Sequence, residues 1–207
     1  MDFTRREFQR VAELSPGLST VAALSHDNRT MYQFSKAPPA NRFTAIVGLD
    51  LSSGTERTIL TLPGPTEALP KQGGVALALN PRGTTLALMM TNPQTRETVF
   101  SIVGIEGTGY RVIYGTADVA DVPDQLTWTS DGRALLFLTT SNGSTSRLMR
   151  MRIDTERPQP EFTGLAVDDL KSLAVSQDGK RVAYGNIGRG SGQLFVLDLA
   201  SLAGQPR

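Results

Sequence analysis

Four segments of the chain repeat one pattern, and this repeat constrains the fold more than any other feature. Each unit has an alternating apolar stretch, a polar turn, a second apolar stretch, a polar loop and a third stretch ending at an acidic residue. The turn residues Asn28, Gly83, Gly132 and Gly179 are separated by 55, 49 and 47 residues. Propeller blades recur at roughly 40 to 50 residues. The repeat therefore predicts an all-β chain of propeller blades.

Apolar residues alternate with other residues on both sides of each turn. The aligned columns are Ala22, Leu77, Leu126 and Leu173; Leu24, Leu79, Trp128 and Val175; and Met31, Leu86, Leu135 and Val182. A spacing of two residues puts side chains on one face of a strand. We therefore expect these columns to lie in the core, and Trp128 with them rather than on a ligand-stacking surface.

The turns have residues that suit a tight hairpin. Gly132 and Gly179 each follow an aspartate, and glycine adopts positive φ without steric cost. Asn28 adopts the same conformation with a modest penalty, so we expect it to replace glycine in the first unit.

The predicted third strands contain two further aligned columns of apolar residues, and an acidic residue follows the second column in each unit. The columns are Val47, Val103, Met151 and Phe195, then Leu49, Ile105, Ile153 and Leu197, followed at once by Asp50, Glu106, Asp154 and Asp198. We expect each acid to accept backbone N–H groups in the turn to the outer strand. The predicted outer strands are residues 55–62, residues 110–114 and a weaker segment ending at Phe162.

Four four-stranded blades follow from this alignment, at about residues 18–63, 75–115, 125–163 and 169–200 of a single propeller domain or of part of a larger propeller. The fourth unit has no outer strand of its own. Residues 6–14 are a candidate for it, either closing the ring on blade 4 or belonging to a truncated earlier blade. The spacing of Phe8, Val11 and Ala12 fits a helical turn equally well.

Composition excludes several classes of function. The chain has 21 basic and 20 acidic residues and no cysteine. Scattered, balanced charge gives no footprint for nucleic acid, and the lack of a long apolar run argues against membrane insertion. Without cysteine there are no disulfides and no cysteine-based zinc sites.

Candidate chemical motifs are incomplete. His26 lies between Ser25 and Asp27, but neighbours in a turn seldom point into one site, and no G-x-S-x-G motif occurs. The acids Asp118, Asp121, Asp124 and Asp131, and the pair Asp168 and Asp169, lack the register of a calcium loop. The glycine-rich run 188–192 lacks the Gly-Lys-Ser/Thr of a phosphate loop. We expect no catalytic residue, metal or cofactor.

The segments WTSDGRALLF (128–137) and VSQDGKRVAY (175–184) resemble the TolB-like (WD40-like) β-propeller repeat, with its Ser-x-Asp-Gly-Lys/Arg turn. SHDNRTMYQF and NPRGTTLALM depart from it, with Asn28 in place of glycine and Pro81-Arg82-Gly83 in place of the usual turn. The resemblance spans about residues 20–199. It implies a bacterial propeller working in the periplasm or another extracytoplasmic setting.

We expect a non-catalytic scaffold for a protein or glycan partner, a protein being preferred, that binds through its loops. These are the second-to-third-strand loops 35–42, 91–97, 139–146 and 186–192 and the blade connections 63–74, 115–124 and 164–169. Candidate partner-binding residues are Arg42, Arg96, Asn142 and Arg189.

Two alternatives remain open. One is the propeller portion of a prolyl-peptidase-like hydrolase, or of a bacterial kinase or regulator sensor, with the catalytic domain or further blades outside this sequence. The other is a complete small ring with an ion or small ligand in its channel.

Overall fold

The structure is a computed structural model that describes residues 18–37, 42–62, 75–91, 97–116, 121–141, 145–168, 170–176, 178, 180–188 and 191–198. Every regular element in these ranges is a β-strand. The described part of the chain therefore contains no helix that is long and apolar enough to span a bilayer.

The strands form four antiparallel sheets, each made of strands that follow one another in sequence. Blade 1 contains β1 (Leu18–Leu24), β2 (Thr30–Ala37), β3 (Arg42–Asp50) and β4 (Glu56–Thr61). Blade 2 contains β5 (Val75–Leu79), β6 (Thr85–Thr91), β7 (Thr98–Gly104) and β8 (Arg111–Thr116). Blade 3 contains β9 (Asp121–Trp128), β10 (Ala134–Ser141), β11 (Thr145–Arg152) and β12 (Pro160–Asp168). Blade 4 contains β13 (Leu170–Val175), β14 (Arg181–Gly188) and β15 (Ser191–Asp198).

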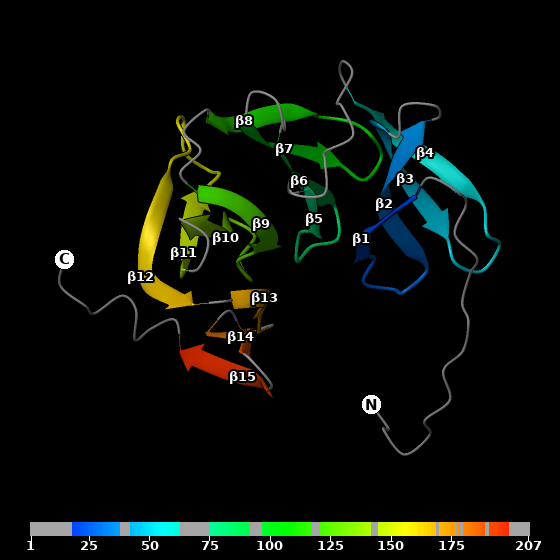
Figure 1. Ribbon diagram of the computed structural model, residues 1–207. Coiled ribbons are helices and arrows are strands. Elements are labelled where there is room, and N and C mark those ends of the chain that lie inside the picture. The colour runs from blue at the N-terminus through cyan, green and yellow to red at the C-terminus, as the bar shows by residue number, and fades with distance from the viewer. Residues whose placement is uncertain are drawn as a thin grey trace.

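The four sheets follow one another around a common centre, with β1, β5, β9 and β13 on the inside (Figure 1). Neighbouring blades contact each other through these inner strands, β1 with β5, β5 with β9 and β9 with β13. This arrangement confirms the predicted all-β propeller. Three blades have four strands as predicted, and the described part of blade 4 has three. Residues 6–14, the predicted fourth strand, lie outside the described residues.

The first hairpin turns of blades 1, 2 and 3 have the same backbone geometry. The amide of Asn28 donates to the carbonyl of Ser25 at 3.0 Å, and Gly83 and Gly132 repeat this bond to Asn80 and Thr129 at 2.9 Å. The φ angles at these three turn positions are 59°, 72° and 67°. Positive φ at Asn28 confirms that asparagine takes the place of glycine there.

A hydroxyl at the start of the turn holds it together in blades 1, 3 and 4. The side-chain oxygens of Ser25, Thr129 and Ser176 each donate to the aspartate two residues later at 2.6 Å. The same oxygens accept the backbone N–H five residues later, at 2.8, 3.0 and 2.9 Å. In blade 2, Asn80 Oδ1 accepts the N–H of Thr85 at 3.1 Å instead.

Each pair of neighbouring blades encloses a hydrophobic core. We call the face that a blade packs on the following blade its outgoing face, and the face that it packs on the preceding blade its incoming face. Blades 1 and 2 enclose Tyr32, Phe34, Ile46, Leu86, Leu88 and Val103. Blades 2 and 3 enclose Ala87, Met89, Phe100, Leu135, Phe137 and Met151. Blades 3 and 4 enclose Leu136, Leu138, Leu148 and Val182.

The predicted alignment of the third strands was wrong by two residues in blades 1 and 4 relative to blades 2 and 3. The residues opposite Met31, Leu86, Leu135 and Val182 are Leu49, Val103, Met151 and Leu197. The acid used for the alignment ends the strand in blades 1 and 4 but lies in the turn beyond it in blades 2 and 3. A shift of two residues keeps each side chain on its face, so the predicted apolar faces were unaffected.

The predicted role of that acid is confirmed in blade 1. Asp50 Oδ1 accepts the N–H groups of Ser52 and Ser53 at 2.9 and 2.8 Å, and these bonds and those from the two hydroxyls lower the pKa of Asp50 to about 2. In blade 2, Glu106 instead pairs with Arg57 of blade 1 at 2.6 Å. In blade 3, Asp154 accepts from Arg152 at 3.1 Å. In both blades the acid binds an arginine side chain instead of the turn N–H groups. In blade 2 the acid is also the longer glutamate, which reaches the neighbouring blade.

Several strands are longer than predicted. β12 runs to Asp168, which lies opposite Thr145, so the strand continues past Phe162 and through the predicted connection 164–169. β14 and β15 pair up to Gly188 and Ser191, within the predicted loop 186–192. Glycine and polar residues indicated loops, but a neighbouring strand satisfies their backbone groups as well as water does.

Candidate functional site

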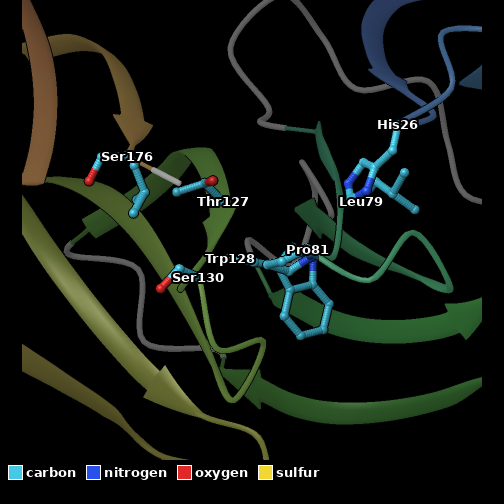
Figure 2. A pocket seen from close by; sticks show the side chains of 8 residues that line it. His26, Leu79, Pro81, Thr127, Trp128, Ser130 and Ser176 are labelled. Carbon is cyan, nitrogen blue, oxygen red and sulfur yellow. The ribbon is translucent and has the colours of Figure 1, made fainter. Parts of the chain in front are cut away.

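A pocket with a volume of about 490 Å³ opens between the ends of the inner strands and is lined by residues of all four blades. Its lining residues are His26, Leu79, Pro81, Thr127, Trp128, Ser130, Val175 and Ser176. Figure 2 shows these side chains around the space, with His26 and Leu79 on one side and Thr127, Ser130 and Ser176 on the other. The volume lies in the range of roughly 300 to 1,000 Å³ that is usual for ligand pockets.

Repeat positions explain why these residues meet. Leu79, Trp128 and Val175 are the last residues of β5, β9 and β13 and belong to one predicted column. Because the inner strands converge at the centre, equivalent residues from successive blades lie around the same space. The predicted columns therefore form the apolar part of the pocket.

The turns themselves form one rim of the pocket. His26 and Pro81 occupy the same position in the turns of blades 1 and 2. A Cβ on Gly83 would lie 3.7 Å from the His26 ring, and a Cβ on Gly132 would lie 3.7 Å from Pro81 Cδ. Each of these side chains thus rests on the turn glycine of the next blade, which fixes its direction.

Two polar groups of the lining are engaged in the scaffold. Trp128 Nε1 donates to the carbonyl of Ala78 in blade 2 at 3.0 Å, and Ser176 Oγ is bound to Asp178 and to Arg181. Trp128 is 4% exposed and packs in the core between blades 2 and 3, which confirms the prediction that it is a core residue. It also lines the pocket, which the sequence did not indicate.

The remaining polar groups are available to a ligand. Within the described residues, the side chains of His26, Thr127 and Ser130 make no hydrogen bond with protein groups. None of the eight lining residues is a carboxylate, a lysine or an arginine. The pocket therefore combines an apolar surface with three uncharged or weakly basic hydrogen-bonding groups.

The acid next to His26 serves the turn. Asp27 follows His26, but its Oδ1 accepts from Ser25 Oγ at 2.6 Å and from the N–H of Arg29 at 3.1 Å. These bonds lower the pKa of Asp27. Ser25, His26 and Asp27 are therefore a capped turn rather than an assembled triad.

Of the predicted partner-binding residues, the structure places only the backbone of Arg42. Arg42 begins β3, opposite Ala37, and its side chain is outside what the structure describes. Arg96, Asn142 and Arg189 lie outside the described residues. Their role in partner binding stays a prediction. The second-to-third-strand loops and the first hairpin turns lie at different ends of each sheet, so the pocket is a separate site.

Among the described residues, no group of three or more histidine, cysteine, aspartate or glutamate side chains is placed to hold a metal ion. The pocket was missed in the sequence because its residues come from four separated turns. The aligned turn positions were visible, but nothing in them showed that they would enclose a space.

The arrangement of the sheets and of the inner-strand pocket defines a β-propeller. TolB from Acinetobacter baumannii is similar in structure, with a TM-score of 0.62 at 18% identity over 87% of this chain and 41% of that chain. Prolyl oligopeptidase B from Galerina marginata gives a TM-score of 0.60 at 9% identity over 86% of this chain and 25% of that chain. A chain in the structure of a nidogen/laminin complex gives 0.56 at 17% identity over 86% and 60%.

These similarities show a β-propeller fold of the TolB-like kind. The chain spans less than two thirds of the length of each of these proteins. No protein-family model matches the sequence, and no curated protein matches it in sequence.

Proposed function

We propose that this chain is a non-catalytic β-propeller scaffold that binds a protein partner at the inner-strand pocket, in an extracytoplasmic setting. The observation that carries the proposal is the pocket itself. Inner-strand ends and neighbouring turn residues of four blades present an apolar surface and three polar side chains with free hydrogen-bonding capacity, which suits a ligand-binding pocket. The proposed setting rests on the resemblance of the repeat to TolB-like propellers.

Two further observations support a protein as the partner. The described surface of the pocket has no cluster of charged groups that would select an ion or a phosphate. One of the similar folds is in a nidogen/laminin complex, where a propeller is part of a protein assembly. We therefore place a protein before a glycan as the partner.

The test is selection of peptides from a random displayed library on the purified chain. We expect enriched peptides that bind the wild type but lose binding to Thr127→Phe, which puts a larger, apolar side chain into the pocket lining and removes the Thr127 hydroxyl. Thr61→Phe introduces the same side chain on an exposed position of β4 and should bind like the wild type. A library without enrichment, or peptides that bind Thr127→Phe unchanged, would overturn the proposed site.

A second candidate is the propeller portion of a prolyl-peptidase-like hydrolase, which the similarity to prolyl oligopeptidase B favours. The two proposals differ in the size of the polypeptide in the cell. An antibody against the chain should detect a product near 22.3 kDa if it works as a separate scaffold. A product larger by a catalytic domain, with peptidase activity after immunoprecipitation, would favour the hydrolase.

A further inference from the structure

We infer that the inner-strand pocket receives one bulky, uncharged aliphatic or aromatic side chain from an extended segment of the partner protein. This inference rests on the proposed function and adds the chemical class of the ligand. Its starting point is the composition of the pocket, in which Leu79, Pro81, Trp128 and Val175 supply the apolar surface. Burying a large apolar side chain against such a surface stabilises a complex, because it removes apolar area from water.

The absence of charge in the lining decides against a charged ligand. A carboxylate or ammonium group in the pocket would lose water and find no oppositely charged side chain among the eight lining residues. The acids of the surrounding turns, Asp27, Asp131 and Asp178, already accept hydrogen bonds from their own turns. An apolar side chain meets neither of these penalties.

The polar groups around the pocket suit a peptide backbone. Thr127 and Ser130 hydroxyls both donate and accept, and a neutral His26 ring does the same. One amide N–H and one carbonyl beside the inserted side chain can therefore be paired. These groups lie on opposite sides of the space in Figure 2, as an extended segment crossing the pocket requires.

A sugar fits the same surface less well. Its hydroxyl groups each need a directional partner, and a buried hydroxyl left unpaired loses its hydrogen bonds to water without replacement. Among the described lining residues, three side chains have free hydrogen-bonding capacity, because Trp128 and Ser176 are bound within the scaffold. A peptide side chain has no such requirement, so the geometry favours a protein ligand.

The chain contains one tryptophan, and it lines this pocket, so its fluorescence reports on the site directly. The probes are acetylated Gly-X-Gly amides with X as Leu, Phe, Asp or Lys, together with maltose, titrated into the wild-type chain. We expect saturable changes with Leu and Phe, at half-saturating concentrations about tenfold or more below those for Asp and Lys. Maltose should give no saturable change.

Thr127→Phe should abolish the Leu and Phe responses, and Thr61→Phe should leave them unchanged. If Thr127→Phe does not fold, as judged by circular dichroism, the comparison among probes on the wild type still decides the ligand class. Equal or tighter binding of Asp, Lys or maltose, or no saturable response to any probe, would overturn the inference. If displayed peptides enriched at this site carry charged residues there, the proposed function stands and the inference fails; without any enriched peptide both fail.

Discussion

The outgoing faces of blades 3 and 4 carry the same position of the repeat in opposite environments. Leu148 in blade 3 is 0% exposed, as is Ile46 in blade 1, and Phe100 in blade 2 is 1% exposed. Leu194 occupies the equivalent position on the third strand of blade 4, where it lies opposite Gly185 of the second strand. Its side chain is nevertheless 76% exposed. Burial at this position depends on a following blade, because a single sheet covers neither of its own faces.

Blade 4 differs in its other residues as well. Blade 3 has Leu136 and Leu138 on the outgoing side of its second strand, whereas the equivalent residues of blade 4 are Ala183 and Gly185. Val196, beside Leu194 on β15, is 61% exposed. The outgoing face of blade 4 is thus both smaller and less covered, while its incoming face carries the same buried column as the other blades, with Val182 at 0% exposure.

The largest expected effect tests this contrast directly by truncating the same position in both blades. Leu148→Ala should lower the free energy of unfolding by about 2 to 5 kcal/mol, because it leaves a cavity in the core between blades 3 and 4. Leu194→Ala should change it by no more than about 0.5 kcal/mol. Urea unfolding followed by circular dichroism measures both. Equal losses would mean that Leu194 is covered in solution, and would break the comparison.

The second prediction concerns the covered interface between blades 1 and 2. Gly107 has a φ of +81°, and a Cβ there would overlap the carbonyl oxygen of Ile59 in blade 1. Gly107→Ala should destabilise the chain by about 2 to 4 kcal/mol, from the unfavourable φ and the overlap together.

Gly109 is the matched control, since it has a φ of +67° and open space where a Cβ would lie. Gly109→Ala should lower the free energy of unfolding by about 1 kcal/mol, through the backbone alone. Thermal and urea unfolding of the two variants separate the steric overlap from the φ effect. If both variants lose the same stability, blades 1 and 2 are not in contact at this corner.

The third prediction tests whether the turn hydrogen bonds contribute the same free energy of unfolding in blade 3, which is packed on both faces, as in blade 4. Thr129→Ala and Ser176→Ala remove the same hydroxyl bonds, one in blade 3 and one in blade 4. Each should lower the free energy of unfolding by about 1 kcal/mol. Thr129→Ser keeps the hydroxyl and should retain most of the stability. A much smaller loss for Ser176→Ala would show that blade 4 unfolds separately from the others.

The smallest expected effect is a dependence of stability on pH. Hydrogen bonds to the turn hydroxyls and amides lower the pKa of Asp27, Asp131 and Asp178, and hold that of Asp50 at about 2. A carboxylate with a lowered folded pKa stabilises the protein above its ordinary value near 3.8 and loses this contribution as the pH falls toward the folded value.

Urea midpoints should therefore be constant above about pH 5 and fall between about pH 4 and pH 2. Asp50→Asn removes the group with the lowest pKa, so its midpoint should fall less steeply over that range. Asp27, Asp131 and Asp178 are exposed and Asp50 is half-buried, so the effect should be modest in every blade. A midpoint that rises as the pH falls would contradict the assignment of these turn bonds.

The repeat was sufficient to predict the propeller, the first hairpins and their faces. Asn28, Gly83 and Gly132 follow from local chemistry, because positive φ has a strong residue preference. Strand ends were harder to predict. Residues 166–168, 186–188 and 191–192 pair in β12, β14 and β15, since the neighbouring strand supplies partners that the local sequence does not reveal. The third-strand alignment was wrong in blades 1 and 4 because it was based on the acid. The number of residues between that acid and the residue paired with the second strand differs among the blades.

The sequence by itself determined where the strand cores and the first hairpin turns lie and which side chains share a face, because these properties depend on φ preferences and on a period of two. The tertiary structure decided which faces are covered and which turns meet. Leu148 and Leu194 are the same residue at the same repeat position, and only the presence of a neighbouring sheet makes one buried and the other exposed. His26, Trp128 and Ser176 line one pocket because three interfaces bring the inner strands together, and no local pattern records such long-range packing.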